Sequence, residues 1–161
     1  MSKSILYSQV TEHFPFVPRP DDSVITTHCN SCIFCQGLIT ELDPHRGEQV
    51  SPSDARVFFN ELTVLSTVGF RWALPSYLEA ILCEESDYDL AEFFLYFFNF
   101  DQPEAEKVLY LKKVSIFSND QLNYLTEVVK HIGRELDEVY SKDAKMALSE
   151  IERLKSTLPN K

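Results

Sequence analysis

Apolar residues recur at intervals of three and four along most of the chain, which is the spacing of an α-helix that buries one face. The clearest run lies near the C-terminus and comprises Leu122, Leu125, Val129, Ile132, Leu136 and Val139. After a break in phase at Ser141, a second run comprises Ala144, Ala147, Ile151, Leu154 and Leu158. Two helices joined by a short turn are expected to pack as a hairpin against the core.

Two segments carry polar residues that typically begin helices. Ser118 and Gln121 have the spacing of a capping box, in which each side chain accepts a hydrogen bond from the backbone of the other residue. Ser51 is followed by Pro52 and then by Asp54, which suit a cap, a first helical position and an acidic first turn. The sequence therefore predicts helices that begin at Ser118 and at Ser51.

The remaining apolar segments predict further helices. The helix after Ser51 should bury Val57, Phe58 and Leu62. Other helices are predicted over 31–42, 69–84 and 88–98, and the last of these is apolar on nearly every side, so it should be largely buried. Segment 103–117 is compatible with a short helix or with a short extended piece.

Residues 1–27 are expected to form an irregular N-terminal arm. Pro15, Pro18 and Pro20 lie close together, and proline both lacks a backbone N–H and disfavours helix in the residue before it. Residues 28–161 then form a single helical domain. The predicted fold is all-α: a bundle of roughly five to seven helices, with this arm at one end and the helical hairpin at the other.

The composition agrees with one soluble domain. The chain has 161 residues, of which 44% are apolar and 12% aromatic, enough to bury a core. Its four glycines disfavour an all-β sandwich and phosphate-binding loops, which depend on glycine. No signal peptide is recognisable, and the most apolar stretch, 93–98, is far shorter than the about 20 residues that span a bilayer. We therefore expect a cytoplasmic protein.

The formal net charge of −10 is concentrated in one part of the chain. Residues 72–106 contain nine acidic residues and no Lys or Arg, whereas the rest of the chain is almost neutral. A field of this sign repels nucleic acid and anionic membranes and attracts basic surfaces. The plainer interpretation is a solvated face that keeps the protein soluble.

Tyr88 lies between Asp87 and Asp89 at an expected helix start, where it cannot easily be buried together with both neighbours. An exposed tyrosine surrounded by carboxylates is a candidate hot spot for a basic partner. A loop tyrosine beside a capping aspartate would explain the same pattern. The candidate partner-binding residues are Glu84, Glu85, Asp87, Tyr88, Asp89 and Glu92.

Three of the four cysteines lie within "HCNSCIFC", at Cys29, Cys32 and Cys35. Thiols stay reduced in the cytosol, where they can bind metal ions. A spacing of three residues places Cys32 and Cys35 on one face of a helix, so the motif is a candidate zinc site. Zinc usually takes four ligands, and His45 is the nearest suitable fourth. The usual second Cys-x-x-Cys pair is missing, so reduced cysteines without metal, or a redox pair, explain the motif as well.

Other polar patterns point away from catalysis. Glu127, His131 and Glu135 share one helix face, which lies away from the apolar stripe and is expected to be a solvated surface. The sequence contains no GxSxG, GxxxxGK[ST], HExxH or GxGxxG motif. We therefore do not expect an enzyme.

Several short motifs resemble a family of uncharacterised bacterial proteins. They are "VPRPDD" followed by "HCNSC", then "GFRWALPSYLEAIL", then "FSNDQLNYLTEVVKHI". The resemblance covers about residues 13–135 and places the family's cysteine pair on Cys29 and Cys32. Members often have His at the position of Cys35, an exchange that a metal site tolerates, so the resemblance implies zinc. It implies no assigned activity.

Two functions are compatible with these features. The first is an acidic binding protein that masks a basic partner, most concretely a bacterial immunity protein that neutralises a toxin. Electrostatic steering would then speed the capture of a cationic partner. The second is a zinc-binding module, structural or regulatory, in which the metal ties the N-terminal arm to the bundle.

Overall fold

The computed structural model describes residues 1–27, 32–47, 49–58, 62–83, 88–99, 104–135 and 138–157. The helices within these ranges are α1 (Lys3–His13), α2 (Ile33–Leu42), the 3-10 helix η1 (Ala55–Phe58), α3 (Thr67–Leu82), α4 (Tyr88–Asn99), α5 (Glu104–Val114), α6 (Asn119–Glu135) and α7 (Glu138–Thr157). Over the same ranges, β-structure is limited to one isolated bridge, between Thr26 and Leu65. The predicted all-α fold is confirmed.

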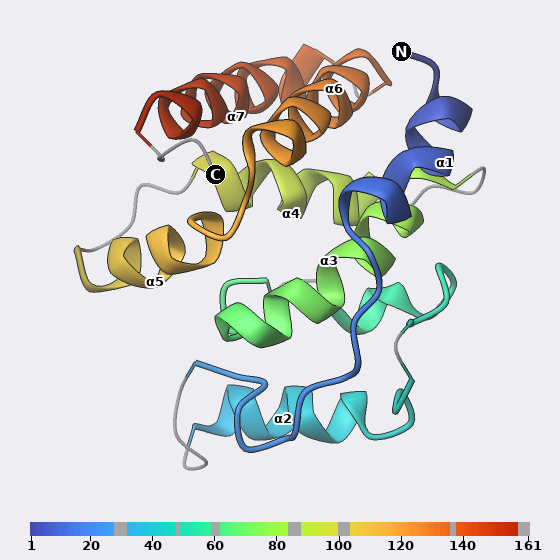
Figure 1. Ribbon diagram of the computed structural model, residues 1–161, viewed down its shortest axis with the longest axis vertical. Coiled ribbons are helices and arrows are strands. Elements are labelled where there is room, and N and C mark those ends of the chain that lie inside the picture. The colour runs from blue at the N-terminus through green and yellow to red at the C-terminus, as the bar shows by residue number, and fades with distance from the viewer. Residues whose placement is uncertain are drawn as a thin grey trace.

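Helix α3 forms the centre of the molecule. Figure 1 shows α3 in the middle, with α2 on one side and α4 and the α6–α7 pair on the other. From Gly69 to Leu82 every residue of α3 except Arg71 is buried, as expected for a helix with neighbours all around it. Ser66 caps the helix, because its hydroxyl accepts a hydrogen bond from the Gly69 N–H at 3.1 Å.

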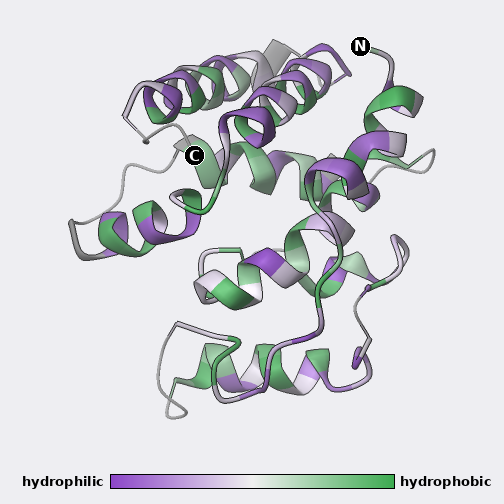
Figure 2. Cartoon of the chain, viewed as in Figure 1, coloured by the Kyte–Doolittle hydropathy of each residue, from purple (hydrophilic) through white to green (hydrophobic). Residues whose placement is uncertain are grey.

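The C-terminal hairpin forms as predicted. The Ser118 N–H donates to Gln121 Oε1 at 2.9 Å and the Gln121 N–H donates to Ser118 Oγ at 3.2 Å, which is the expected capping box. Hydrophobic and hydrophilic residues alternate around α6 and α7, and the apolar sides face the other helices (Figure 2). Helix α7 begins at Glu138, three residues before the predicted phase break at Ser141.

The first half of the N-terminal arm was predicted wrongly, because Lys3–His13 form helix α1. Leu6 and Val10 are its buried residues, so the apolar pattern in the sequence is short. The helix is fixed by α6: the Tyr124 hydroxyl donates to the Leu6 carbonyl at 2.7 Å, and Gln121 donates to the His13 carbonyl at 2.6 Å. Residues 14–20 are not helical, as their prolines predicted.

The second half of the arm runs beside α3 (Figure 1). The Ile25 carbonyl accepts a hydrogen bond from the Ser66 N–H at 2.9 Å, and the Thr27 N–H donates to the Val64 carbonyl at 2.8 Å. Ile25 itself is fully buried. The arm is therefore part of the core and not only a surface cover.

Two predicted helices differ in detail from the structure. Where the sequence predicted a helix beginning at Ser51, the described residues form only the single 3-10 turn η1. Phe58 in this turn is buried, as predicted. Helix α2 lies within the predicted range 31–42 and buries Leu38 and Leu42. Its first residues, Ile33 and Phe34, are 81% and 76% exposed and do not join the core.

A buried lysine connects α5 to the segment before α3. Lys113 is 2% exposed, and its ammonium donates hydrogen bonds to the carbonyls of Leu62 and Thr63. Burial lowers the pKa of Lys113 to about 8, because the charged form loses its hydration. No local pattern distinguishes this lysine from the exposed lysines of the chain.

Candidate partner-binding surface

Acidic and tyrosine side chains from α4 and α7 meet where these two helices pack together. The Tyr140 hydroxyl of α7 donates a hydrogen bond to Glu92 Oε2 of α4 at 3.1 Å. Tyr96, one turn further along α4, is 44% exposed. We refer to Asp89, Glu92, Tyr96, Tyr140 and Asp143 as the acidic α4–α7 surface.

The electrostatics of this surface are visible in its tyrosines. The negative charges of Glu92 and then of Asp143 raise the pKa of Tyr96. The hydrogen bond to Glu92, with the charge of that residue, raises the pKa of Tyr140. Both shifts show that a further negative charge is unfavourable at this surface. A positive charge placed nearby would be electrostatically stabilised.

Two of the six predicted partner-binding residues, Asp89 and Glu92, belong to this surface. Asp89 is exposed and forms an ion pair with Arg56 at 3.1 Å. Tyr88 is the first residue of α4, but its side chain lies outside the described residues, as do Glu84, Glu85 and Asp87.

One acid of the 72–106 window does not contribute to a surface. Glu79 is 7% exposed and accepts a hydrogen bond from Gln49 Nε2 at 2.7 Å. Burial raises the pKa of this carboxyl group. The acidic field outside the protein is therefore weaker than the count of charges in the window suggests.

Sequence reasoning missed the contribution of α7. Tyr140 and Asp143 lie almost fifty residues after Glu92 and outside the acidic window, so no local pattern connects them. Tyr96 belongs to the helix over 88–98, which was expected to be largely buried. It faces outward because α4 buries its other side, including Phe94, Phe97 and Phe98.

The cysteine motif is only partly within the described residues, because Cys29 lies outside them. Cys32 occupies the N-cap position of α2 without a capping hydrogen bond from its side chain, and Cys35 on the first turn is fully buried. His45 follows the end of α2, where its backbone N–H donates to the Leu42 carbonyl at 2.9 Å. Across the described ranges, no group of three or more His, Cys, Asp or Glu side chains is arranged to hold a metal ion. Zinc at Cys29, Cys32, Cys35 and His45 remains a prediction.

Metal content tests the zinc prediction directly. If Cys29 completes a site with Cys32 and Cys35, protein purified without chelator or metal-affinity resin should contain about one zinc per chain. Cys32→Ser should remove the metal and lower the thermal stability, whereas Cys83→Ser, a substitution outside the motif, should do neither. A metal-free wild-type chain whose thiols all react with a thiol reagent would contradict the prediction.

The face of α6 with Glu127, His131 and Glu135 is not fully solvated, contrary to the sequence expectation. His131 is only 7% exposed, and this burial lowers its pKa. Glu127 Oε2 lies 3.9 Å from the N-terminal amino group, which α1 brings to this side of α6. The face was misjudged because α1 was not predicted.

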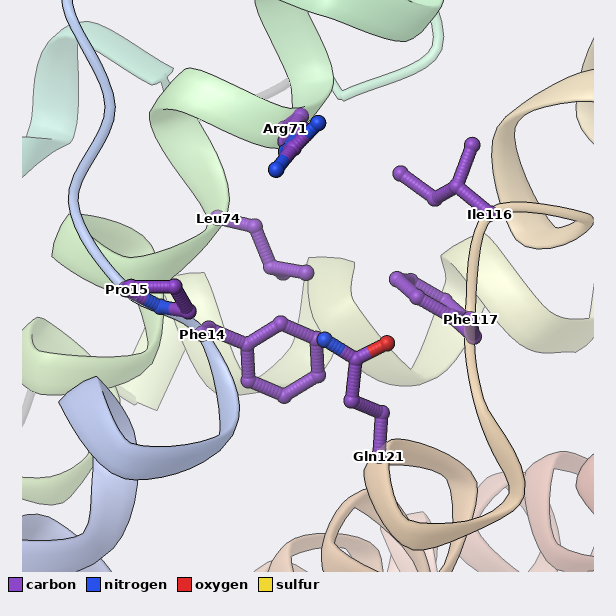
Figure 3. A pocket seen from close by; sticks show the side chains of 7 residues that line it. All are labelled: Phe14, Pro15, Arg71, Leu74, Ile116, Phe117 and Gln121. Carbon is purple, nitrogen blue, oxygen red and sulfur yellow. The ribbon is translucent and has the colours of Figure 1, made fainter. Parts of the chain in front are cut away.

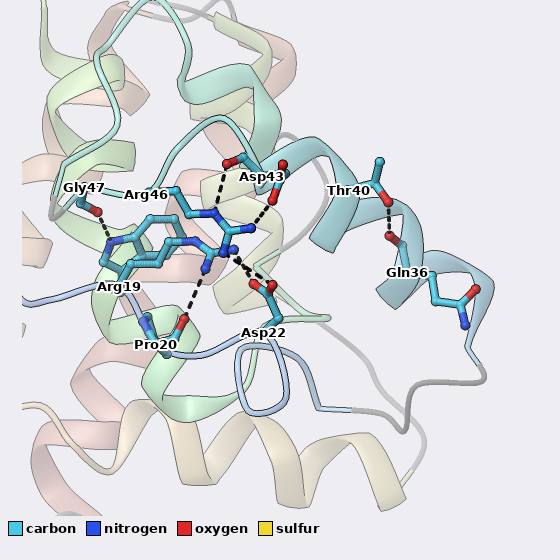
Figure 4. A network of polar contacts seen from close by, with 9 residues as sticks. Arg19, Pro20, Asp22, Gln36, Thr40, Asp43, Arg46 and Gly47 are labelled. Atoms are coloured by element: carbon cyan, nitrogen blue, oxygen red, sulfur yellow. Dashed lines mark hydrogen bonds and ion pairs between the residues drawn. The ribbon is translucent and has the colours of Figure 1, made fainter.

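A second polar network joins the arm to the loop after α2 and to α3 (Figure 4). The Arg19 guanidinium donates to Asp22 Oδ1 at 2.6 Å and lies over the Trp72 ring, 5.7 Å from its centroid. Arg46 bonds both Asp22 and Asp43, and Trp72 Nε1 donates to the Gly47 carbonyl at 3.1 Å. These side chains bond one another, apart from Arg19 Nε, which is buried without a hydrogen-bond partner among the described residues, so the network is a structural connection.

Comparison with protein-family models, with curated proteins and with solved structures gave no match for this chain. Among the described helices, none is both long enough and apolar enough to cross a membrane. The candidate function therefore rests on the chemistry of the chain's own surfaces.

Proposed function

We propose that this protein binds a basic partner protein through the acidic α4–α7 surface. The observation that supports the proposal is that Glu92 and Asp143 act on the exposed Tyr96, while Glu92 and Asp89 act on the neighbouring Tyr140. The three carboxylates come from two helices and lie near two tyrosine side chains, one from each helix. Arg56 forms an ion pair with Asp89 at the edge of this surface.

The chemistry of this surface suits a lysine- or arginine-rich partner. Tyrosine offers a large rigid contact area with a polar tip, and it is enriched at the energetic centres of protein interfaces. Carboxylates around it would pair with basic side chains, fix the orientation of the partner and speed association. The most concrete form of the proposal is an immunity protein that occupies the basic surface of a toxin and thereby neutralises it.

Charge reversal on this surface tests the proposal. The wild-type chain is immobilised at low salt, basic proteins that it retains from a lysate of its source cells are identified, and their association rates are measured. Asp89→Lys combined with Asp143→Lys should slow association by about tenfold at low salt, with the difference shrinking as salt is added.

A variant with the same change in net charge provides the matched control. Glu12→Lys combined with Glu41→Lys alters exposed acids on α1 and α2, away from the acidic α4–α7 surface. This control should slow association by less than about twofold, because the local field at the surface is retained. Equal rates for the two double variants would contradict the proposed role of this surface.

A further inference from the structure

A small hollow lies between the end of α1, the first half of α3 and the segment before α6. Its volume is about 220 Å³, and its lining residues are Phe14, Pro15, Arg71, Leu74, Ile116, Phe117 and Gln121. Figure 3 shows these side chains arranged around the hollow, with Arg71 on one side and Gln121 opposite. The hollow shares no residue with the acidic α4–α7 surface.

The floor of the hollow is rigid and aromatic. Phe14, Leu74 and Phe117 are 6%, 1% and 3% exposed, so they belong to the core. The rings of Phe14 and Phe117 pack edge to face, with centroids 5.7 Å apart. A flat apolar group placed on this floor would gain dispersion and ring contacts without any rearrangement of the core.

Arg71 is the unusual member of the lining. It is the one exposed residue of α3 between Gly69 and Leu82, and its guanidinium has no hydrogen bond or ion pair anywhere in the described part of the chain. Most other arginines there have a carboxylate or carbonyl partner, as Arg19, Arg46 and Arg153 do. An unpaired guanidinium beside an apolar hollow can bind an anion through two parallel hydrogen bonds.

The other polar side chain of the lining is already engaged. Gln121 Nε2 donates to the His13 carbonyl at 2.6 Å, and Gln121 Oε1 accepts from the Ser118 N–H at 2.9 Å. It therefore acts as a fixed wall of the hollow. A ligand that matches the lining has an apolar body and a single anionic group at the Arg71 end.

The size and charge narrow the ligand further. Liquid water occupies about 30 Å³ per molecule, so the hollow has room for roughly seven waters, or a ligand of about ten non-hydrogen atoms. Arg71 is the one cation among the described residues of the lining, and one arginine balances a single negative charge. A monocarboxylate matches this single positive charge better than a phosphate, which carries up to two negative charges. The net charge of −10 of the whole chain would repel the phosphate more strongly.

We propose that the hollow beside Arg71 binds a small aromatic monocarboxylate, with the carboxylate on the guanidinium and the ring on Phe14, Leu74 and Phe117. This site is additional to the acidic α4–α7 surface, and its test does not depend on the proposed partner. The free acid is favoured over the C-terminus of a protein because the hollow has room for little more than one ring with a short acid chain.

The test uses 3-phenylpropionate as the probe and follows the amide resonances of the ¹⁵N-labelled full chain. We expect saturable shifts at residues 71–74 and 116–121, with a dissociation constant on the order of 1 mM for a ligand of this size. The neutral 3-phenylpropionamide, which has the same shape, should bind about tenfold more weakly because it loses the charge-assisted contact.

Variants separate the two parts of the site. Arg71→Gln should weaken binding of the acid by about tenfold and leave the amide unaffected. Ile116→Trp, at a half-buried position on the rim, should fill the hollow and abolish binding of both compounds. Arg134→Gln, on the exposed face near the far end of α6, is the matched control and should change nothing.

Three results would overturn the proposal. They are the absence of saturable shifts up to about ten times the expected dissociation constant, equal binding of the acid and the amide, and unchanged binding by Arg71→Gln. Tighter binding of phenyl phosphate would show that the ligand of the hollow is a phosphate and not a carboxylic acid. Tighter binding of a blocked dipeptide ending in phenylalanine would show that the ligand is a protein C-terminus. Each variant is first shown to fold by its amide spectrum, so that loss of binding is not loss of structure.

Discussion

Gly69→Ala is expected to destabilise the protein by about 3 kcal/mol. A methyl group at this position in the first turn of α3 would overlap the carbonyl oxygen of Ile25. That oxygen cannot move away easily, because it accepts a hydrogen bond from the Ser66 N–H, and Ser66 Oγ donates to the Val24 carbonyl at 2.6 Å. Relief of the overlap would separate the N-terminal arm from α3. The free energy of unfolding from urea titration measures the effect.

Gly37→Ala is the matched control for this substitution. Gly37 lies inside α2, and a methyl group there would meet nothing within 4 Å. Alanine is the better helix former, so this variant should be more stable than the wild type by about 0.5–1 kcal/mol. If both glycine variants changed the free energy of unfolding in the same direction and by a similar amount, close packing of the arm on α3 would not explain why position 69 requires glycine.

The role of Gly69 also gives a physical reason for one motif of the sequence. Gly69 opens the segment "GFRWALP". The next residue, Phe70, stacks on Phe97 with ring centroids 4.9 Å apart, and Trp72 packs under Arg19. The segment thus contacts α4 on one side and the arm on the other. Apart from the exposed Arg71, its residue types follow from packing.

The helices with long amphipathic patterns could be predicted from the sequence. The capping box at Ser118 and Gln121 and the apolar spacing of α6 are local features, and local features are what a sequence displays. Helix α1 was missed because it is stabilised by packing on α3 and α6, which are distant in sequence. The contacts of Leu6 and His13 with Tyr124 and Gln121 join residues more than one hundred positions apart.

The candidate surfaces were only partly predictable for the same reason. Asp89 and Glu92 were identified from a local excess of acids, whereas Tyr140 and Asp143 joined them only when α7 packed on α4. The hollow beside Arg71 is formed by α1, α3 and the segment before α6, so no single stretch of sequence contains it. Burial also removed Glu79 from the predicted acidic field.

The stability of the protein is expected to rise by about 2 kcal/mol between pH 7.5 and pH 9.5 because of Lys113. Its pKa is about 8 in the folded state and near the ordinary 10.5 in the unfolded chain. Between these values the unfolded chain holds a proton that the folded protein has released, so a rise in pH favours folding. Below pH 8 both states are protonated, and the folded state carries the full cost of the buried charge.

Lys113→Met identifies this lysine as the source of the rise. Methionine has a similar length and cannot titrate, so the free energy of unfolding of the variant should lack the increase over this pH range. Lys112→Met, at the exposed neighbouring position on α5, should keep it. Tyr110 and Tyr124 act in the opposite direction at higher pH, because burial raises the pKa of both hydroxyls and the unfolded chain then loses its protons first. The comparison is therefore made below pH 10. If the free energy of unfolding of the wild type changed with pH in the same way as that of Lys113→Met, Lys113 would stay charged in the folded state.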